Sequence, residues 1–114
     1  VRIYEKLTSH KIVKGDKERQ LSLKNALKYV NTEYVMVTDV ARACISKEII
    51  ENLIKNPADC TAPFIKPVDT VVFNNKTIDR DEVKLIQTPQ LSKTEILKKA
   101  LEIDKIFTDE RAAI

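Results

Sequence analysis

The sequence predicts an α/β fold in which helices cover both faces of a largely parallel sheet. Tyr34 to Thr38 is a continuous apolar run rich in β-branched and aromatic residues, which is typical of a strand buried on both faces. Segments with helical periodicity come before and after this run, so strands and helices alternate. A hairpin signal at Asn74-Asn75-Lys76 interrupts the alternation. Because an isolated hairpin is marginally stable in water, we expect it to pack outside its own sheet.

The first half of the chain contains two predicted helices. Residues 1–7 have only weak helical character, and Lys11 to Lys14 is a short strand candidate before a turn at Gly15-Asp16. A helix is predicted from about Glu18, and its apolar face at i, i+3, i+4 and i+7 consists of Leu23, Ala26, Leu27 and Val30. Ser46 is the predicted cap of the next helix, which Asn56-Pro57 ends. Its apolar face consists of Ile49, Ile50, Leu53 and Ile54.

The second half is predicted to begin with a buried strand over Cys60 to Ile65. The hairpin arms follow at Val68 to Phe73 and Thr77 to Arg80, and Val83 to Ile86 is a further strand candidate. Ser92-Lys93-Thr94-Glu95 has the pattern of a capping box. The apolar face of the helix that it would start consists of Ile96, Leu97, Ala100, Leu101 and Ile103. Thr108 or Asp109 is the predicted cap of a last helix.

The composition excludes several classes of protein. The chain has 114 residues and a net charge of +3, and its Lys and Arg are interleaved with Asp and Glu, so we expect neither a nucleic-acid partner nor a membrane partner. No apolar run is long enough to cross a bilayer, and no signal-peptide pattern is present. Cys44 and Cys60 lack CxxC spacing, which favours reduced core thiols in a cytoplasmic protein.

Glycine usage suggests that the chain is part of a longer protein. Gly15 is the only glycine, whereas average usage is about 7%. The chain also opens on Val1 and closes on Ala112-Ala113-Ile114 without a helix-stopping residue. We therefore expect residues 1–114 to be one incomplete domain.

The carboxyl end of the predicted Tyr34–Thr38 strand is the first candidate site, since ligands of open α/β sheets bind there. Asp39 follows the strand directly, and Arg42 comes three residues later. A carboxylate in this position can bind a divalent metal, a ribose hydroxyl or a cation, and an arginine can pair with phosphate. An Asp that caps the next turn beside a surface Arg is equally compatible with the spacing.

Two other polar groups are candidates. Gln87-Thr88-Pro89-Gln90 places a hydroxyl and two amides after a strand candidate, although a simple polar loop would have the same composition. Thr70 and Arg80 lie on the two arms of the hairpin. Arg80 stands between two aspartates, so that by itself it is typical of an exposed arginine.

The presence of a single histidine limits the catalytic mechanisms that the sequence supports. His10 has no partner pattern and is expected on the surface, so the sequence supports no His-based catalysis, Ser-His-Asp triad or zinc site. Nucleotidyl transfer to a phosphate monoester needs none of these groups, because its attacking oxygen is already largely ionised near neutral pH (second pKa about 6). Such an enzyme has to align two anions and offset their repulsion with a metal and Arg or Lys.

Six motifs, in order and spacing, resemble the 2-C-methyl-D-erythritol 4-phosphate cytidylyltransferases from about His10 to the end. The motifs are Gly15–Ser22, Val37–Arg42, Val68–Thr70, Thr77–Arg80, Gln87–Gln90 and Thr108–Glu110. In the way its sequence diverges from the other members of the family, the chain resembles the bifunctional form. In that form this domain is fused to a 2-C-methyl-D-erythritol 2,4-cyclodiphosphate synthase. The resemblance implies a three-layer α/β/α, Rossmann-like nucleotidyltransferase fold. It also implies transfer of CMP from CTP to 2-C-methyl-D-erythritol 4-phosphate, with release of pyrophosphate.

The resemblance further implies roles for individual residues. Ser22, with the backbone around Asp16 and Lys17, would read the cytosine. Asp39 and Val40 would lie beside the ribose and phosphates of CTP, with Asp39 near Mg²⁺ or another divalent cation, or near the second substrate. The residues implied for the acceptor pocket are Arg42, Thr70, Arg80, Thr88 and Thr108.

The family relation also implies a homodimer. Residues 66–80 would form an arm that clasps a second subunit, so that Thr70 and Arg80 act in the partner's site and Arg80 holds the attacking phosphate. Asp39 and Arg80 are thus the implied catalytic residues.

The sequence departs from the family pattern at Thr38, Ala43 and Asp16, where histidine, proline and a second glycine are usual. The family's glycine-containing phosphate loop would precede this stretch, and a substrate-positioning lysine would follow it. We therefore expect these residues alone to be inactive. Two alternatives stay open: a ribitol-phosphate cytidylyltransferase, which shares the DxxR, DT and QTPQ elements, and a non-catalytic nucleotide-binding or dimerisation module. Thr77–Arg80 favours the methylerythritol enzyme over the ribitol one.

Overall fold

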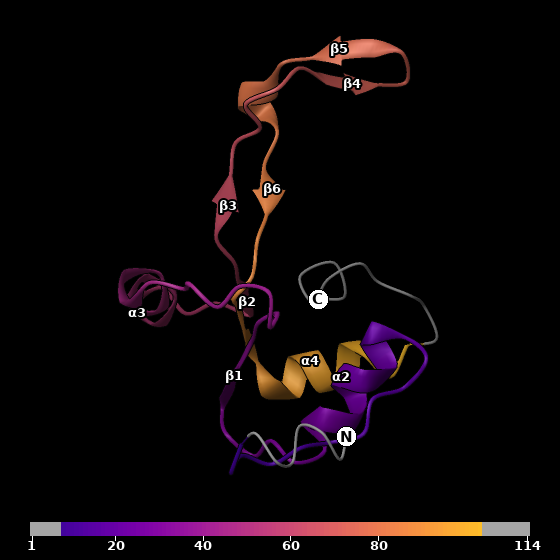
Figure 1. Cartoon of the computed structure of the whole chain (residues 1–114), viewed down its shortest axis with the longest axis vertical. Helices are drawn as coiled ribbons and strands as arrows, with labels where there is room; N and C mark the ends of the chain where they lie inside the picture. Colours follow the sequence, from indigo (N-terminus) through magenta and orange to yellow (C-terminus); the bar gives the residue numbers. More distant parts are fainter. Residues whose placement is uncertain (1–7, 104–114) are drawn as a thin grey trace.

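The computed structural model describes residues 8–103, which form a body of helices and short strands with a ribbon that projects from it (Figure 1). The predicted elements at residues 1–7 and around Thr108 lie outside this range. The predicted strand at Lys11–Lys14 is wrong, because the chain there follows an irregular path and pairs with no strand of the described residues.

The core of the body lies between two helices and the main sheet. Helix α2 spans Arg19–Leu27 and helix α4 spans Thr94–Ala100. Three buried leucines form the centre of the core: Leu27, Leu97 and Leu101. The residues packed against them are Leu23, Val30, Val35 and Val37. Leu23 and Leu27 of the face predicted for α2 are therefore confirmed in the core, and Val30 also packs there although it lies after the end of the helix.

The main sheet has three strands in the order β1-β7-β2. Strand β1 spans Tyr34–Val37, β7 spans Gln90–Lys93 and β2 spans Cys60–Thr61. Because β7 is antiparallel to both neighbours, β1 and β2 run in the same direction on either side of it. The expected mostly parallel sheet is wrong for the described residues, in which every strand pair is antiparallel.

Strand β7 is covered on both faces. Its consecutive residues Gln90, Leu91 and Ser92 are 2%, 7% and 0% exposed. Since consecutive residues of a strand point to opposite faces, both faces of the sheet are buried here. Helix α3, Lys47–Lys55, lies on the side of the strands away from α2 and α4 (Figure 1). Helices therefore lie on both sides of the strands, as an α/β class requires.

Helix α3 begins and ends where the sequence predicts. The Ser46 hydroxyl accepts a hydrogen bond from the Ile49 N–H at 3.3 Å, which satisfies one of the amides of the first turn. The helix ends before Asn56. Of the predicted apolar face only Leu53 is buried, whereas Ile54 is exposed.

The predicted capping box at Ser92 is wrong, because these residues extend the sheet. Ser92 belongs to β7 and its hydroxyl donates to the Cys60 Sγ at 3.3 Å. The residue before α4 is Lys93, which makes no side-chain capping bond. Instead, the Thr94 N–H donates to the Glu33 carbonyl at 2.9 Å and ties the start of α4 to the residue before β1.

The predicted strand over Cys60–Ile65 splits at Pro63, which has no N–H to contribute to a ladder. Its first part is β2, and its second part is β3, Phe64–Ile65, which pairs with β6, Leu85–Ile86. Phe64 and Ile65 are 45% and 55% exposed, so this part is not a buried strand. Strands β3 and β6 form the two sides of the projecting ribbon (Figure 1).

A hairpin lies at the far end of the ribbon. Strands β4, Val71–Phe73, and β5, Lys76–Ile78, are joined by Asn74 and Asn75, whose φ angles are 51° and 60°. Asparagine tolerates this left-handed region, and a two-residue turn of this kind matches the twist of a hairpin. The predicted hairpin is confirmed with shorter strands. Its second arm ends earlier than predicted, since Arg80 lies in the 3-10 turn η1, Arg80–Glu82.

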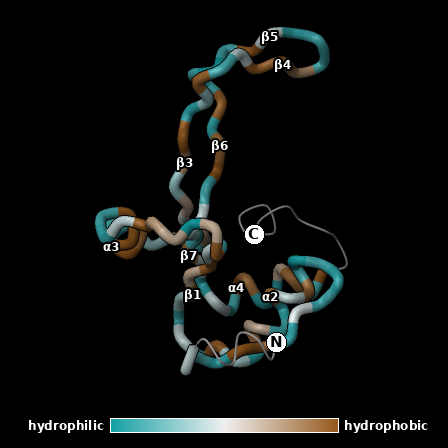
Figure 2. Tube along the Cα trace, in the orientation of Figure 1, coloured by the Kyte–Doolittle hydropathy of each residue, from teal (hydrophilic) through white to brown (hydrophobic). Residues whose placement is uncertain are grey.

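Hydrophobic residues lie along both sides of the ribbon and in the β4 arm of the hairpin (Figure 2). Val72 and Phe73 are 61% and 65% exposed. A projecting surface of this kind is typical of a contact with another protein. No helix in residues 8–103 has the length and apolar character that a membrane-crossing segment needs.

The cysteines and the histidine complete the comparison with the predictions. Neither cysteine forms a disulfide. Cys60 is half-buried, but Cys44 is exposed, so its prediction as a core thiol is wrong. His10 is exposed, as predicted.

Candidate functional site

Asp39 lies directly beyond the carboxyl end of β1, and other elements hold its side chain. Its Oδ2 accepts a hydrogen bond from the Thr88 Oγ1 at 3.1 Å, and its Oδ1 lies 3.8 Å from the Arg19 Nη2. Its backbone carbonyl accepts from the Arg42 N–H at 3.0 Å. The carboxylate thus faces α2 and the loop before β7. This geometry favours the site interpretation over a simple turn cap.

The antiparallel pairing of β7 explains how Thr88 reaches Asp39 across 49 residues of sequence. Val37, the last residue of β1, pairs with Gln90, the first residue of β7. The residues just before β7 therefore lie beside those just after β1. The Gln87–Pro89 loop follows the carboxyl end of β6, as the sequence predicts, and it precedes a strand that the sequence does not reveal.

Arg42 and Thr88 line the same pocket, which has a volume of about 320 Å³. The other residues that line it are Ala41, Ala43, Cys44, Ile45, Ile49 and Pro89. The structure thus brings together Asp39, Arg42 and Thr88, three of the predicted site residues. Arg42 and Thr88 line the pocket, and Asp39 adjoins it through its hydrogen bond to Thr88. A guanidinium and a hydroxyl in one pocket can bind a small phosphorylated polyol.

The turn before α2 contains the residues predicted to read a base. The Asp16 N–H donates to the Ser22 Oγ at 2.8 Å, and the Lys17 N–H donates to the Asp16 Oδ1 at 2.7 Å. The Ser22 hydroxyl in turn donates to the Glu18 carbonyl at 3.0 Å. A Cβ at Gly15 would lie 3.3 Å from the Ser22 Oγ, which explains the value of glycine at this close approach.

A second pocket of about 480 Å³ lies at this turn. The residues that line it are Lys14, Gly15, Asp16, Lys17 and Asn25. The structure therefore gathers Asp16, Lys17 and Ser22 as predicted. Arg19 begins α2 within the same turn and pairs with Asp39, so this turn is linked to the end of β1.

Arg19 is the functional candidate that the sequence analysis missed, although it stands inside the Gly15–Ser22 motif. The available signal was its position in the first turn of a helix whose start faces the end of a strand. The exposed fractions of the Arg19 and Asp39 side chains are 45% and 49%. Both side chains thus retain access to a ligand.

Thr70 and Arg80 lie in a different part of the molecule. The Arg80 Nη1 donates to the Val68 carbonyl at 2.6 Å, which anchors the guanidinium at the base of the hairpin beside Thr70. This base is at the far end of the β3–β6 ribbon from the end of β1 (Figure 1). Within one chain, therefore, Thr70 and Arg80 do not join Asp39. Val40 is exposed, and Thr108 is outside the described residues.

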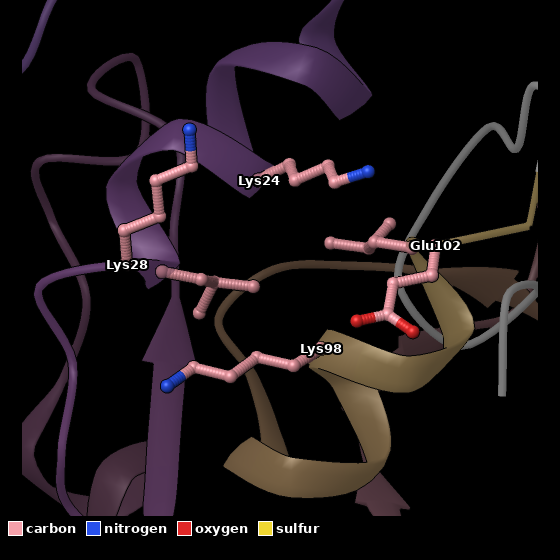
Figure 3. A pocket seen from close by; sticks show the side chains of 6 residues that line it. Lys24, Lys28, Lys98 and Glu102 are labelled. Carbon is pink, nitrogen blue, oxygen red and sulfur yellow. The ribbon is translucent and has the colours of Figure 1, made fainter.

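A third pocket lies between α2 and α4, with a volume of about 330 Å³ (Figure 3). Its labelled side chains are Lys24, Lys28, Lys98 and Glu102, and the amino groups of the three lysines point in different directions. The Lys98 Nζ donates to the Val30 carbonyl at 2.8 Å and so ties α4 to the chain after α2. This pocket has no convergent set of cations for an anionic ligand.

An ion pair of the body shifts the pKa of Lys93. The hydrogen bond and the charge of Asp59 raise the pKa of Lys93, whose Nζ lies 2.9 Å from the Asp59 Oδ1. This ion pair joins the end of β7 to the residue before β2 and is structural. Among the described residues, no group of three or more His, Cys, Asp and Glu side chains could hold a metal ion by itself.

Comparison of the sequence with known proteins gives relatives that all belong to one enzyme family. The family model "IspD: 2-C-methyl-D-erythritol 4-phosphate cytidylyltransferase" matches residues 2–114. The bifunctional enzyme IspD/IspF of a Nitratiruptor species is 58% identical over 113 residues, which are 97% of this chain and 30% of that protein. The corresponding protein of Aliarcobacter butzleri is 57% identical over 90% of this chain and 28% of its own length.

Solved structures agree with the sequence relatives. The bifunctional IspDF from Campylobacter jejuni has a TM-score of 0.90 and 43% identity, over 98% of this chain and 31% of that one. The cytidylyltransferase from Francisella tularensis has a TM-score of 0.71 and 32% identity, over 87% of this chain and 54% of that one. The chain thus has the α/β fold of these enzymes and spans about 30% of the curated relatives' length. It belongs to the IspD family, the 2-C-methyl-D-erythritol 4-phosphate cytidylyltransferases.

Proposed function

We propose that the protein that carries this chain transfers CMP from CTP to 2-C-methyl-D-erythritol 4-phosphate and releases pyrophosphate. Family membership supports this reaction, since the family model and the relatives carry its name. The structural observation that best supports this reaction is the 3.1 Å hydrogen bond between Thr88 and Asp39. This bond joins two of the motifs beside one pocket.

The proposed reaction is a single displacement at phosphorus. An oxygen of the acceptor phosphate attacks the α-phosphorus of CTP, and the bond from that phosphorus to the oxygen shared with the β-phosphate breaks. Pyrophosphate leaves with the bonding electrons, so no protein nucleophile is needed. Arg42 would pair with the acceptor phosphate. The Thr88 hydroxyl, whose proton goes to Asp39, would accept a hydrogen bond from a hydroxyl of the acceptor. Ser22, with the backbone around Asp16 and Lys17, would read the cytosine.

We also propose Mg²⁺ or another divalent cation as the cofactor, with Asp39 as its protein ligand. Mg²⁺ is commonly held by one or two carboxylates together with substrate phosphates, so a single aspartate fits. The two carboxylate oxygens offer about four lone-pair sites, which leaves acceptor capacity beside Thr88 and Arg19. When bound, the metal would neutralise charge on the triphosphate. Thr88 and Arg19 would orient the carboxylate that holds it.

A homodimer through the 66–80 arm is the third part of the proposal. The exposed apolar side chains of Val72 and Phe73 need a partner surface, and a two-stranded hairpin is marginally stable alone. Thr70 and Arg80 lie far from Asp39 in one chain, and in a dimer they would serve the neighbouring site. We expect this enzyme to be cytoplasmic, with no nucleic-acid or membrane partner.

We propose the activity for the parent protein and not for these residues alone. Gly15 is the single glycine here, and a glycine-rich loop that cradles phosphates requires more than one. Further strands of a three-layer α/β/α sheet would pair with the edge of β1 that has no partner strand within residues 8–103. The triphosphate-handling groups would come from those parts of the parent domain.

The test is pyrophosphate release by the full-length protein with CTP and Mg²⁺. Methylerythritol phosphate and ribitol phosphate are compared as acceptors, and Asp39→Asn and Arg42→Ala variants are measured beside the wild type. We expect turnover with methylerythritol phosphate and a large loss in both variants. Turnover with ribitol phosphate alone would move the proposal to the ribitol enzyme. CTP binding without pyrophosphate release in the presence of either acceptor would favour a non-catalytic module.

A further inference from the structure

The Arg19–Asp39 ion pair connects two sites that the proposed reaction would use together. Arg19 is the first residue of α2 and lies inside the turn that positions Asp16, Lys17 and Ser22. Asp39 lies at the end of β1 beside the pocket of Arg42 and Thr88. We infer that Arg19 is a positioning residue that aligns the Asp39 carboxylate with the nucleotide-binding turn, an inference that rests on the proposed function.

The carboxylate is held from two directions. The Thr88 hydroxyl donates to Oδ2 at 3.1 Å, and the Arg19 guanidinium attracts Oδ1 from 3.8 Å. Each oxygen thus has its own partner, and each partner comes from a different element. One partner alone would leave the carboxylate free to rotate about its last side-chain bond, whose torsional preference is broad. Both together fix which oxygen faces which substrate.

At the other end of the ion pair, Arg19 directly follows the turn before α2. The Ser22 Oγ accepts from the Asp16 N–H and donates to the Glu18 carbonyl, so one side chain fixes the backbone that leads into Arg19. A nucleotide that orders this turn would also order the first residue of α2. The position of Asp39 would then follow occupation of the nucleotide pocket.

The exposure of the pair sets the size of the effect. The two side chains are 45% and 49% exposed, and ion pairs near a surface contribute little to stability. We therefore expect loss of Arg19 to reduce catalysis while leaving the folded state intact. A loss of about 1 kcal/mol of alignment corresponds to a roughly fivefold lower rate.

The experiment is a double-mutant cycle in the full-length protein with Arg19→Gln, Asp39→Asn and the combined variant. We expect Arg19→Gln to lower kcat for the polyol phosphate by roughly fivefold, with a much smaller change in KM. In the Asp39→Asn background the same change should cause no further loss, because its target is gone. Arg19→Lys should retain most of the activity, since one contact needs a charge and not a planar fork.

The matched control is Lys24→Gln, which removes the same charge from the same helix on the side of the α4 pocket. It should leave kcat and KM at the wild-type values. Equal losses from Arg19→Gln in both backgrounds, or full activity in that variant, would overturn the inference. If the wild type transfers CMP to neither acceptor, the proposed function fails instead. In that case the Kd of CTP is measured for the wild type and the three variants. Coupling between Arg19 and Asp39 in these Kd values would support the positioning role of Arg19, and strict additivity would overturn it.

Discussion

Mixing two inactive variants tests whether the hairpin of one subunit serves the site of another. Arg80 is anchored at the base of the hairpin, at the far end of the β3–β6 ribbon from Asp39. Arg80→Ala and Asp39→Asn should each abolish most transfer in a homodimer. In a heterodimer of the two, Asp39 of the first subunit and Arg80 of the second are both intact. One of the two sites is then complete.

Random pairing of the two kinds of subunit sets the size of the recovery. If subunits re-associate at random from equal amounts, about half of the dimers are heterodimers, and each has one intact site of two. The mixture should therefore regain about a quarter of wild-type activity. If Arg80 instead acted on its own chain, the heterodimer would have no intact site, and mixing would restore nothing.

The assay is pyrophosphate release after the two variants are unfolded together in equal amounts and refolded as a mixture. The matched control combines Asp39→Asn with Arg42→Ala. Asp39 and Arg42 lie in one turn beside one pocket, so every heterodimer site of this pair lacks a group. Activity in this control equal to that of the Arg80 mixture would refute the reasoning, as would the absence of recovery in the Arg80 mixture.

Three further predictions concern the body. Thr88→Val removes the hydroxyl that donates to Asp39 and should lower kcat/KM for the polyol phosphate by roughly fivefold; unchanged kinetics would show that the bond does not align the carboxylate. The buried Thr94 Oγ1 has no hydrogen-bond partner within residues 8–103, so Thr94→Val should raise the free energy of unfolding by about 1 kcal/mol in urea titrations, whereas a loss would point to a partner. Asp59 raises the pKa of Lys93 from 10.5, so the stability that this pair contributes is present below 10.5 and is lost as pH rises through the raised pKa. Thermal unfolding of Asp59→Asn should accordingly differ from the wild type at neutral pH and converge with it in strong alkali, and a constant difference would contradict this.

Local chemistry made the helices predictable from sequence. Ser46 caps α3 with its own hydroxyl, and the apolar spacing of α2 matches its buried face. The same local logic failed at Ser92, because a serine three residues before a glutamate looks like a capping box whether or not a helix starts there. Only the long-range pairing of Ser92 with Val35 and Cys60 decides its conformation.

Local signals predicted some residues of the candidate site, whereas the contacts between those residues depend on long-range pairing. The position of Asp39 after a buried strand is a local signal, and it led to a residue that the structure places next to a pocket-lining Arg42. The contact between Asp39 and Thr88 depends on β7, which is short and polar and gives no strand pattern. The residues were therefore named from the motifs of a family, and the antiparallel strand that joins them came from the structure. Arg19 stands inside a motif but had no implied role there, and its contact with Asp39 came from the structure.

The ribbon leaves the body from β2 and returns to it at β7, and these two strands are hydrogen-bonded neighbours. The two ends of the excursion are thus fixed side by side, whatever lies between them. Adding one residue to each side would extend the ribbon by about 3.3 Å and leave the sheet register unchanged. The distance between two catalytic centres in such a dimer could consequently drift during evolution without disturbing the core of either subunit. The ribbon is thus a spacer whose length is adjustable, and the number of paired residues along it sets that length.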